Sequence, residues 1–207
     1  MFTRAKVKPC PQGGLYGLME RHGQGWKRDG SAWGFRLRLG VWSMRDESEE
    51  AGPMFEIRED DLSSDATRAL LALHLKGMHE TSPPENVFAL DLAGLQDRRV
   101  TVWSAWDGDR IASIGALKML SGREAEIKSM RTHPDFLGQG AGAAILDHII
   151  AVARARGVIR LSLETGRGEA FEAAIRLYQR RGFKKGEAFA DYQPNAFSQF
   201  FHLTLGA

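Results

Sequence analysis

The chain has 207 residues, of which 43% are hydrophobic and 26% are charged, and its formal net charge is +2. This composition suits a domain that buries a core, and no apolar run approaches the roughly 20 residues of a membrane-spanning helix. Cys10 is the single cysteine, which excludes an internal disulfide framework and a cysteine metal cluster. Because no basic-then-apolar secretory leader is present, we expect a cytoplasmic protein that binds neither membrane nor metal.

Residues 1–53 differ from the rest of the chain. They hold nine basic and six acidic residues, nine of the 23 glycines and three tryptophans, and only GFRLRLGVW (34–42) alternates as a strand would. They contain no dense Lys/Arg run, so a nucleic-acid-binding arm is disfavoured. We expect an N-terminal extension that is flexible or that results from an extended start assignment, followed by one folded domain over 54–207.

The pattern of apolar residues in 54–207 predicts an alternation of strands and helices. Apolar side chains at helical spacing predict a helix over 66–80, which Pro83 and Pro84 end, and a second short helix within 86–95. Longer helices follow over 141–157 and around Phe171 to Tyr178. Strands are expected, in chain order, over 54–58, 99–106, 110–120, 124–132, 157–165, 184–192 and 199–205.

The segment EAEIKSMRTHPDFLGQGAG (124–142) runs from a strand through a Gly-rich loop into a helix. Backbone N–H groups in such a loop and in the first helical turn have no internal partner, and the helix dipole leaves roughly half a positive charge there. Gly138, Gly140 and Gly142 let the main chain approach a ligand closely. The segment therefore predicts a phosphate site.

Two familiar phosphate-binding loops, the Walker loop and the Rossmann fingerprint, do not fit this segment well. A Walker loop needs Gly-Lys-Ser/Thr, which is absent. A Rossmann fingerprint is matched by Gly138, Gly140 and Ala143, with Glu164 as the ribose-binding acid. However, residues 133–137 separate these glycines from the strand, and the chain after Glu164 is too short for a second nucleotide-binding half.

Two segments together resemble the GNAT superfamily of acetyl-coenzyme A (acetyl-CoA) dependent N-acetyltransferases. In EIKSMRTHPDFLGQGAG, Gly140 and Gly142 occupy the small positions of the family motif Arg/Gln-x-x-Gly-x-Gly/Ala, and Leu137 stands where Arg or Gln is usual. LYQRRGF (177–183) matches the family's Leu-Tyr-x-x-x-Gly-Phe. Together with EIKSMRT, the segments SPPENVFALD, RLSLETG and FADY look like the bacterial YsnE-type branch, and the resemblance covers 54–205.

The resemblance implies an α/β (α+β) fold with a mixed, mostly antiparallel sheet, splayed between its central strands and covered by helices on both faces. It also implies that acetyl-CoA is the cosubstrate and that no metal takes part. A free N–H near the splay, such as that of Met130, would stabilise the oxyanion. The residues assigned to coenzyme binding are Met130, Arg131, Thr132, Leu137, Gly138, Gln139, Gly140, Ala141 and Gly142.

The expected reaction requires a base, because an acceptor amine with a pKa near 10 is mostly protonated at neutral pH. Strand alternation predicts that Glu126, Lys128 and Met130 share one face, and Glu126 is the first candidate for this base. A solvent-facing or paired carboxylate is the alternative. His79 and Tyr192 are further candidates for base or substrate contact, each with a structural role as the alternative.

By resemblance, the Tyr178 hydroxyl lies near the coenzyme sulfur and protonates the departing thiolate. Lys128 is predicted to hold a substrate carboxylate, with Arg131 on the opposite strand face. The expected function is acetyl transfer to the primary amine of a small molecule. Two alternatives stay open: the acceptor is a protein or peptide amine, or the domain is a non-catalytic module that binds coenzyme A (CoA) or a nucleotide. A homodimer is also open.

Overall fold

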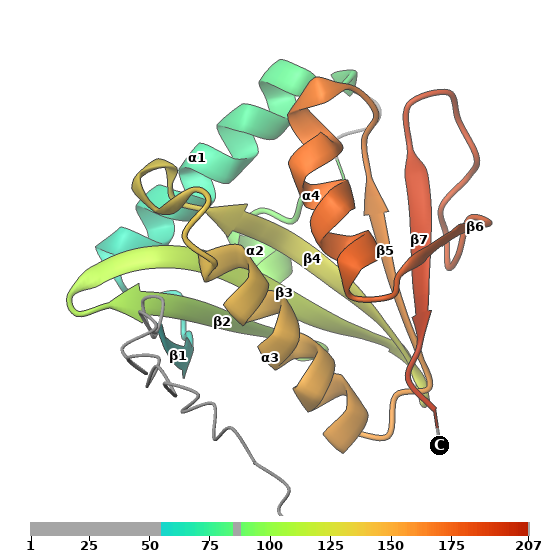
Figure 1. The fold of residues 1–207 in the computed structure, drawn as a ribbon, viewed down its shortest axis with the longest axis horizontal. Helices are drawn as coiled ribbons and strands as arrows, with labels where there is room; N and C mark the ends of the chain where they lie inside the picture. The colour runs from blue at the N-terminus through green and yellow to red at the C-terminus, as the bar shows by residue number, and fades with distance from the viewer. Residues whose placement is uncertain (1–54, 85–87, 207) are drawn as a thin grey trace, which may run out of the picture. The chain divides into compact units, whose positions relative to one another are not determined.

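A computed structural model of the chain describes residues 55–84 and 88–206. These residues form a seven-stranded sheet with helices on both faces, as the ribbon shows (Figure 1). The alternating run at 34–42 and the domain boundary expected at residue 54 lie outside the described residues. Within the described residues, no helix is long and apolar enough to cross a membrane.

The elements follow the predicted order closely. They are β1 (Glu56–Glu59), α1 (Asp65–Thr81), α2 (Leu92–Leu95), β2 (Val100–Asp107), β3 (Arg110–Ser121), β4 (Glu124–Thr132), the 3-10 helix η2 (Pro134–Phe136), α3 (Ala141–Ala155), β5 (Arg160–Thr165), α4 (Glu169–Arg180), β6 (Lys184–Gly186) and β7 (Gln199–Thr204).

Two predicted elements are shorter than expected. The strand predicted over 184–192 ends at Gly186, because Ala190 has a left-handed φ of 48° and the N–H of Tyr192 bonds to the carbonyl of Phe189, which makes a turn. The second helix covers only Leu92–Leu95, where the Asp91 carboxylate caps its start by accepting from the N–H of Gly94. Both differences leave the predicted topology intact.

The sheet has the order β1-β2-β3-β4-β5-β7-β6, and every neighbouring pair is antiparallel except β4 and β5. The parallel pairing of β4 with β5 ends at Glu126 and Ser162. Beyond that pair the two strands separate (Figure 1). The predicted mixed, mostly antiparallel sheet with a splay between its central strands is therefore confirmed.

Each face of the sheet has its own core. Helices α3 and α4 pack on one face through residues such as Ile145, Ile149 and Ile175. Helices α1 and α2 cover the other face, where Leu70 and Leu95 meet β2 and β3. The helices on each face carry apolar side chains at helical spacing, and these side chains pack against the sheet from both sides. The first core includes Tyr178, and the second lies under α1.

Candidate active site

The loop between β4 and α3 presents a cluster of backbone N–H groups. Gly138 and Gly140 have φ values of 76° and 89°, a left-handed conformation that glycine adopts without steric cost, and Gly140 is the N-cap of α3. Within the part of the chain that the structure describes, no backbone or side-chain acceptor takes the N–H of Gly138, Gly140, Ala141, Gly142 or Ala143. Such a cluster at a helix N-terminus suits a phosphate group.

The close approach of α3 to β4 explains why a small residue stands at Gly142. A Cβ at that position would lie 2.8 Å from Oγ1 of Thr132, too close for an ordinary contact. Leu137, at the position where the family motif has Arg or Gln, is 65% exposed and extends from the loop into solvent. The loop therefore offers main-chain donors, and Leu137 adds no polar group to them.

A β-bulge at Ser129 changes which side chains of β4 share a face. Lys128 is opposite Ala116 and Arg131 is opposite Ile114, so one residue of β3 corresponds to two on β4. Ser129 has a φ of 53°, which is unusual for a residue with a side chain. Because Ala116 and Ile114 are two residues apart, Lys128 and Arg131 lie on the same face.

The bulge overturns two predictions about the faces of β4. Met130 does not share a face with Glu126, because it packs in the core under α3 together with Ile127. Arg131 was predicted on the other face of β4 from Lys128, but both residues lie on the face that α1 covers. Strict alternation through Ser129 led to both errors, since one extra residue reverses the pattern.

Three predicted site residues meet on the α1 face of the sheet. The phenol of Tyr192 donates to Oε1 of Glu126 at 2.5 Å, and Nζ of Lys128 donates to the Tyr192 oxygen at 2.7 Å. Lys128 also donates to the carbonyl of Phe88 at 2.9 Å and lies 3.3 Å from Glu126. Glu126 is 2% exposed, so this carboxylate is buried and paired.

The segment between β6 and β7 brings Tyr192 to this position. The rings of Phe88, Phe189 and Phe200 surround the tyrosine, with centroids 5.0, 5.0 and 5.8 Å away. Burial raises the pKa of Tyr192, and the charge of Glu126 and its hydrogen bond raise it further. Tyr192 therefore stays protonated and acts as a donor to the carboxylate.

Two more titratable residues, Glu164 and His74, lie near this group, and neither was predicted to belong to it. Burial raises the pKa of Glu164 on β5, an effect that Ser198 and the charge of Lys128 partly offset. Its Oε1 is buried and has no hydrogen-bond partner among the described residues. His74 on α1 is also buried, and its pKa is lowered to about 4 by burial and by the charges of Arg131 and Lys128.

The sequence patterns that could have identified Glu164 and His74 were weak. Glu164 lies two residues after Ser162, the β5 partner of Glu126, so strand alternation places both carboxylates on one face. His74 has the helical spacing of a core residue, and only its contacts distinguish it. His79, the histidine that the sequence singled out, is exposed near the end of α1 and takes part in no side-chain hydrogen bond or salt bridge of the described residues.

Tyr178 lies on the opposite face of the sheet from Tyr192. It is 6% exposed within the core under α3 and α4, and its ring meets that of Phe183 edge to face, with centroids 5.9 Å apart. Burial raises the pKa of its phenol. Among the hydrogen bonds of the described residues, none involves its hydroxyl.

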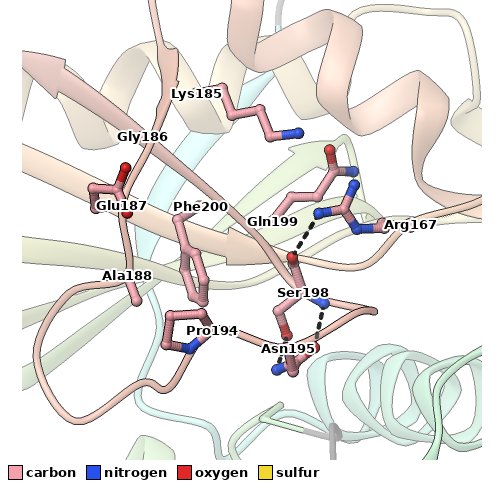
Figure 2. Close-up of a pocket in the computed structure, with 10 residues that line it drawn as sticks. All are labelled: Arg167, Lys185, Gly186, Glu187, Ala188, Pro194, Asn195, Ser198, Gln199 and Phe200. Carbon is pink, nitrogen blue, oxygen red and sulfur yellow. Dashed lines mark hydrogen bonds between the residues drawn. The ribbon is translucent and has the colours of Figure 1, made fainter.

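A separate hollow of about 130 Å³ lies beside β6 and β7. Figure 2 shows Arg167 reaching toward it and donating to the carbonyl of Ser198, while Asn195 bonds to the same serine. None of the predicted site residues lines it. Among the residues that the structure describes, no group of three His, Cys, Asp or Glu side chains could hold a metal ion.

Comparisons with known proteins identify the family of this chain. The family model described as "Acetyltransferase (GNAT) family" matches residues 55–183. The N-acetyltransferase YedL of Escherichia coli is 48% identical over 152 residues, which are 73% of this chain and 96% of YedL. The N-acetyltransferase YsnE of Bacillus subtilis is 47% identical over 142 residues, 68% of this chain and 94% of YsnE.

A solved structure gives the same result for the fold. It is that of a Klebsiella pneumoniae protein to which an acyl-CoA N-acyltransferase activity is ascribed, with a TM-score of 0.63 and 30% identity. The match covers 74% of this chain and 99% of that one. The family and the YsnE-type branch predicted from the sequence are therefore confirmed.

Proposed function

The chain belongs to the acetyltransferase (GNAT) family, and we propose that it transfers the acetyl group of acetyl-CoA to the primary amine of a small molecule. One observation carries the proposal. The unpartnered N–H groups of Gly138 and of residues 140–143 follow β4 and η2 in the chain, and β4 is the strand that separates from β5 after Glu126. A phosphate site and an open strand edge thus follow one another along the chain.

The two features fit the two parts of CoA. The free N–H groups and the dipole of α3 suit its pyrophosphate. Residues 127–132 of β4 have no partner in β5, so their main-chain groups can hydrogen-bond the pantetheine arm as an added strand would. The bulge at Ser129 leaves the neighbouring Met130 without a partner on β3, and its N–H is our candidate for stabilising the oxyanion.

In the proposed reaction, the amine nitrogen attacks the thioester carbonyl and the carbon–sulfur bond breaks. The proton lost by the amine passes to Glu126, directly or through a water, and Tyr192 and Lys128 hold that carboxylate in place. The departing thiolate takes a proton from the hydroxyl of Tyr178. The products are an amide and CoA with a free thiol.

The test is to incubate the protein with acetyl-CoA and a panel of amines, amino acids and peptides while free thiol is followed. Thiol release that depends on small amines supports the proposal. Release with peptides alone would make a peptide amine the acceptor. Calorimetric binding of CoA without release on any acceptor would identify a non-catalytic module, and tight NAD binding without CoA binding would overturn the assignment of the phosphate site.

A further inference from the structure

The side chain of Arg131 carries a charge that the described residues leave without a counter-ion. Its Nε is buried and has no hydrogen-bond partner there, and no salt bridge among the described residues involves its guanidinium. A charge that is withdrawn from water is normally paired, because burial without a partner costs free energy. Arg131 is only partly buried, so a ligand can reach it.

Arg131 lies on the same face of the sheet as Glu126 and Lys128, where we expect the acceptor amine to bind. The bulge turns it to the face that carries Lys128, which is the face covered by α1. On α1, a Cβ at Gly77 would lie 3.3 Å from Nη1 of Arg131, so the guanidinium rests against that glycine. His74 lies one turn earlier on α1, and the positive charges of Arg131 and Lys128 add to the effect of burial in lowering its pKa.

Lys128 is not available for the same task. Its ammonium group has three donors, and three acceptors already lie near it, namely the carbonyl of Phe88, the hydroxyl of Tyr192 and the carboxylate of Glu126. A ligand carboxylate would have to displace one of them. Arg131 offers five N–H donors in a planar fork that matches a carboxylate with two parallel hydrogen bonds.

We propose that the acceptor is an amino acid, or another small amine that carries a carboxylate, and that Arg131 binds this carboxylate. The inference rests on the proposed function and names its substrate class. The amine of such a molecule is attracted to the carboxylates of Glu126 and Glu164, and its carboxylate is attracted to Arg131. The same face of the sheet thus carries charged groups for each end of an amino acid.

The test compares each of the twenty amino acids with its carboxamide, which keeps the amine and removes the negative charge. Acetyl transfer is measured as kcat/KM for the wild type and for Arg131→Gln. The ratio of acid to amide is compared between the two proteins, so that the different reactivities of the two amines cancel. We expect this ratio to fall by about 10²-fold in the variant, since a hydrogen-bonded ion pair is lost.

Two further variants separate binding from folding. Arg123→Gln removes an exposed arginine in the turn before β4 and should leave the ratio unchanged. Gly77→Ala places a methyl group against the guanidinium without removing the charge, and should raise KM for the acid while the amide is unaffected. CoA affinity and the circular dichroism spectrum report whether each variant remains folded.

The outcomes distinguish this inference from the proposed function. An acid-to-amide ratio that is the same in the wild type and in Arg131→Gln, or a wild type that accepts only amines without a carboxylate, overturns the role of Arg131. Absence of thiol release on every acceptor overturns the proposed function instead. In that case calorimetry of the amino acids and their amides on the CoA-loaded protein still tests Arg131, because a carboxylate site would bind only the acids and only with Arg131 present.

Discussion

The phenol of Tyr192 donates a hydrogen bond of 2.5 Å to the carboxylate of Glu126, a residue 66 positions earlier in the chain. The bond joins the segment between β6 and β7 to the central strand β4. Lys128 donates to the same phenol oxygen, so the tyrosine links a buried cation to a buried anion. One hydroxyl therefore contributes both to the fold and to the position of the proposed base.

Tyr192→Phe should lower the free energy of unfolding by about 1–3 kcal/mol, because Glu126 and Lys128 each lose a partner inside the protein. Urea denaturation at neutral pH measures the change. Tyr178→Phe is the matched control, since it deletes a hydroxyl that makes no hydrogen bond among the described residues and should cost less than about 0.5 kcal/mol. Equal losses in the two variants would show that the Tyr192 bonds contribute nothing to stability.

The pKa of His74 predicts a specific dependence of stability on pH. The folded protein has a pKa of about 4 for this residue, against 6.5 for an unperturbed histidine. Between these values the unfolded chain binds the proton and the folded chain does not, so the free energy of unfolding decreases as the pH falls from about 6.5 to about 4. The full effect is up to ~3 kcal/mol.

His74→Leu should remove this part of the pH dependence, because leucine fills the buried position without titrating. Urea denaturation series between pH 7.5 and pH 4 measure the slope in each protein. His79→Leu is the control, since that side chain is exposed on the same helix and should leave the slope as it is in the wild type. A slope that is unchanged in His74→Leu would assign the acid sensitivity to other groups.

The order of helices and strands was predictable because each element carries a local pattern. The apolar stripe of α3 and the alternation of β2 and β3 are properties of neighbouring residues, and tertiary contacts only reinforce them. The Gly-rich loop was also predictable, since Gly138 and Gly140 mark the positive φ values that the turn requires. The proposal of a phosphate site rests on these local signals alone.

The arrangement of side chains on β4 and around Tyr192 was less predictable, because it depends on contacts between residues far apart in the sequence. A serine at a φ of 53° has no local signal, and the pairing of β4 with β3 imposes that conformation at a cost of about 1–2 kcal/mol. The bulge then reverses the faces of Met130 and Arg131. Likewise, nothing in the segment FADY itself indicates that Tyr192 reaches Glu126.

Removal of residues 1–53 should leave the midpoint of thermal unfolding and the affinity for CoA nearly unchanged. The family match begins at residue 55, and each element described above lies after that point. Thermal denaturation and calorimetry of the full chain and of 54–207 test this proposal for the domain boundary. A large loss of either quantity would mean that the first 53 residues stabilise the domain.

Leu137→Arg should increase the affinity for CoA. The side chain is 65% exposed, so the change should not disturb folding, and it restores a charged donor beside the free N–H groups of the loop. One charge-assisted hydrogen bond to a phosphate is worth a decrease in Kd of about tenfold at low salt, and less as salt screens it. Leu137→Met is the neutral control, and a Kd that is equal in both variants would place the coenzyme phosphates elsewhere.

Tyr178→Phe is the most direct test of the proposed acid. The ring keeps its contacts with the core under α4, so the protein should fold and bind CoA as the wild type does. If the phenol protonates the thiolate, acyl transfer should slow by up to ~10²-fold. The effect lies at the lower end of general-acid catalysis, because a thiol of pKa near 8.5 leaves fairly well without help. Single-turnover measurement on an accepted amine isolates the chemical step from product release. A rate equal to that of the wild type in this experiment would leave Tyr178 with a packing role alone.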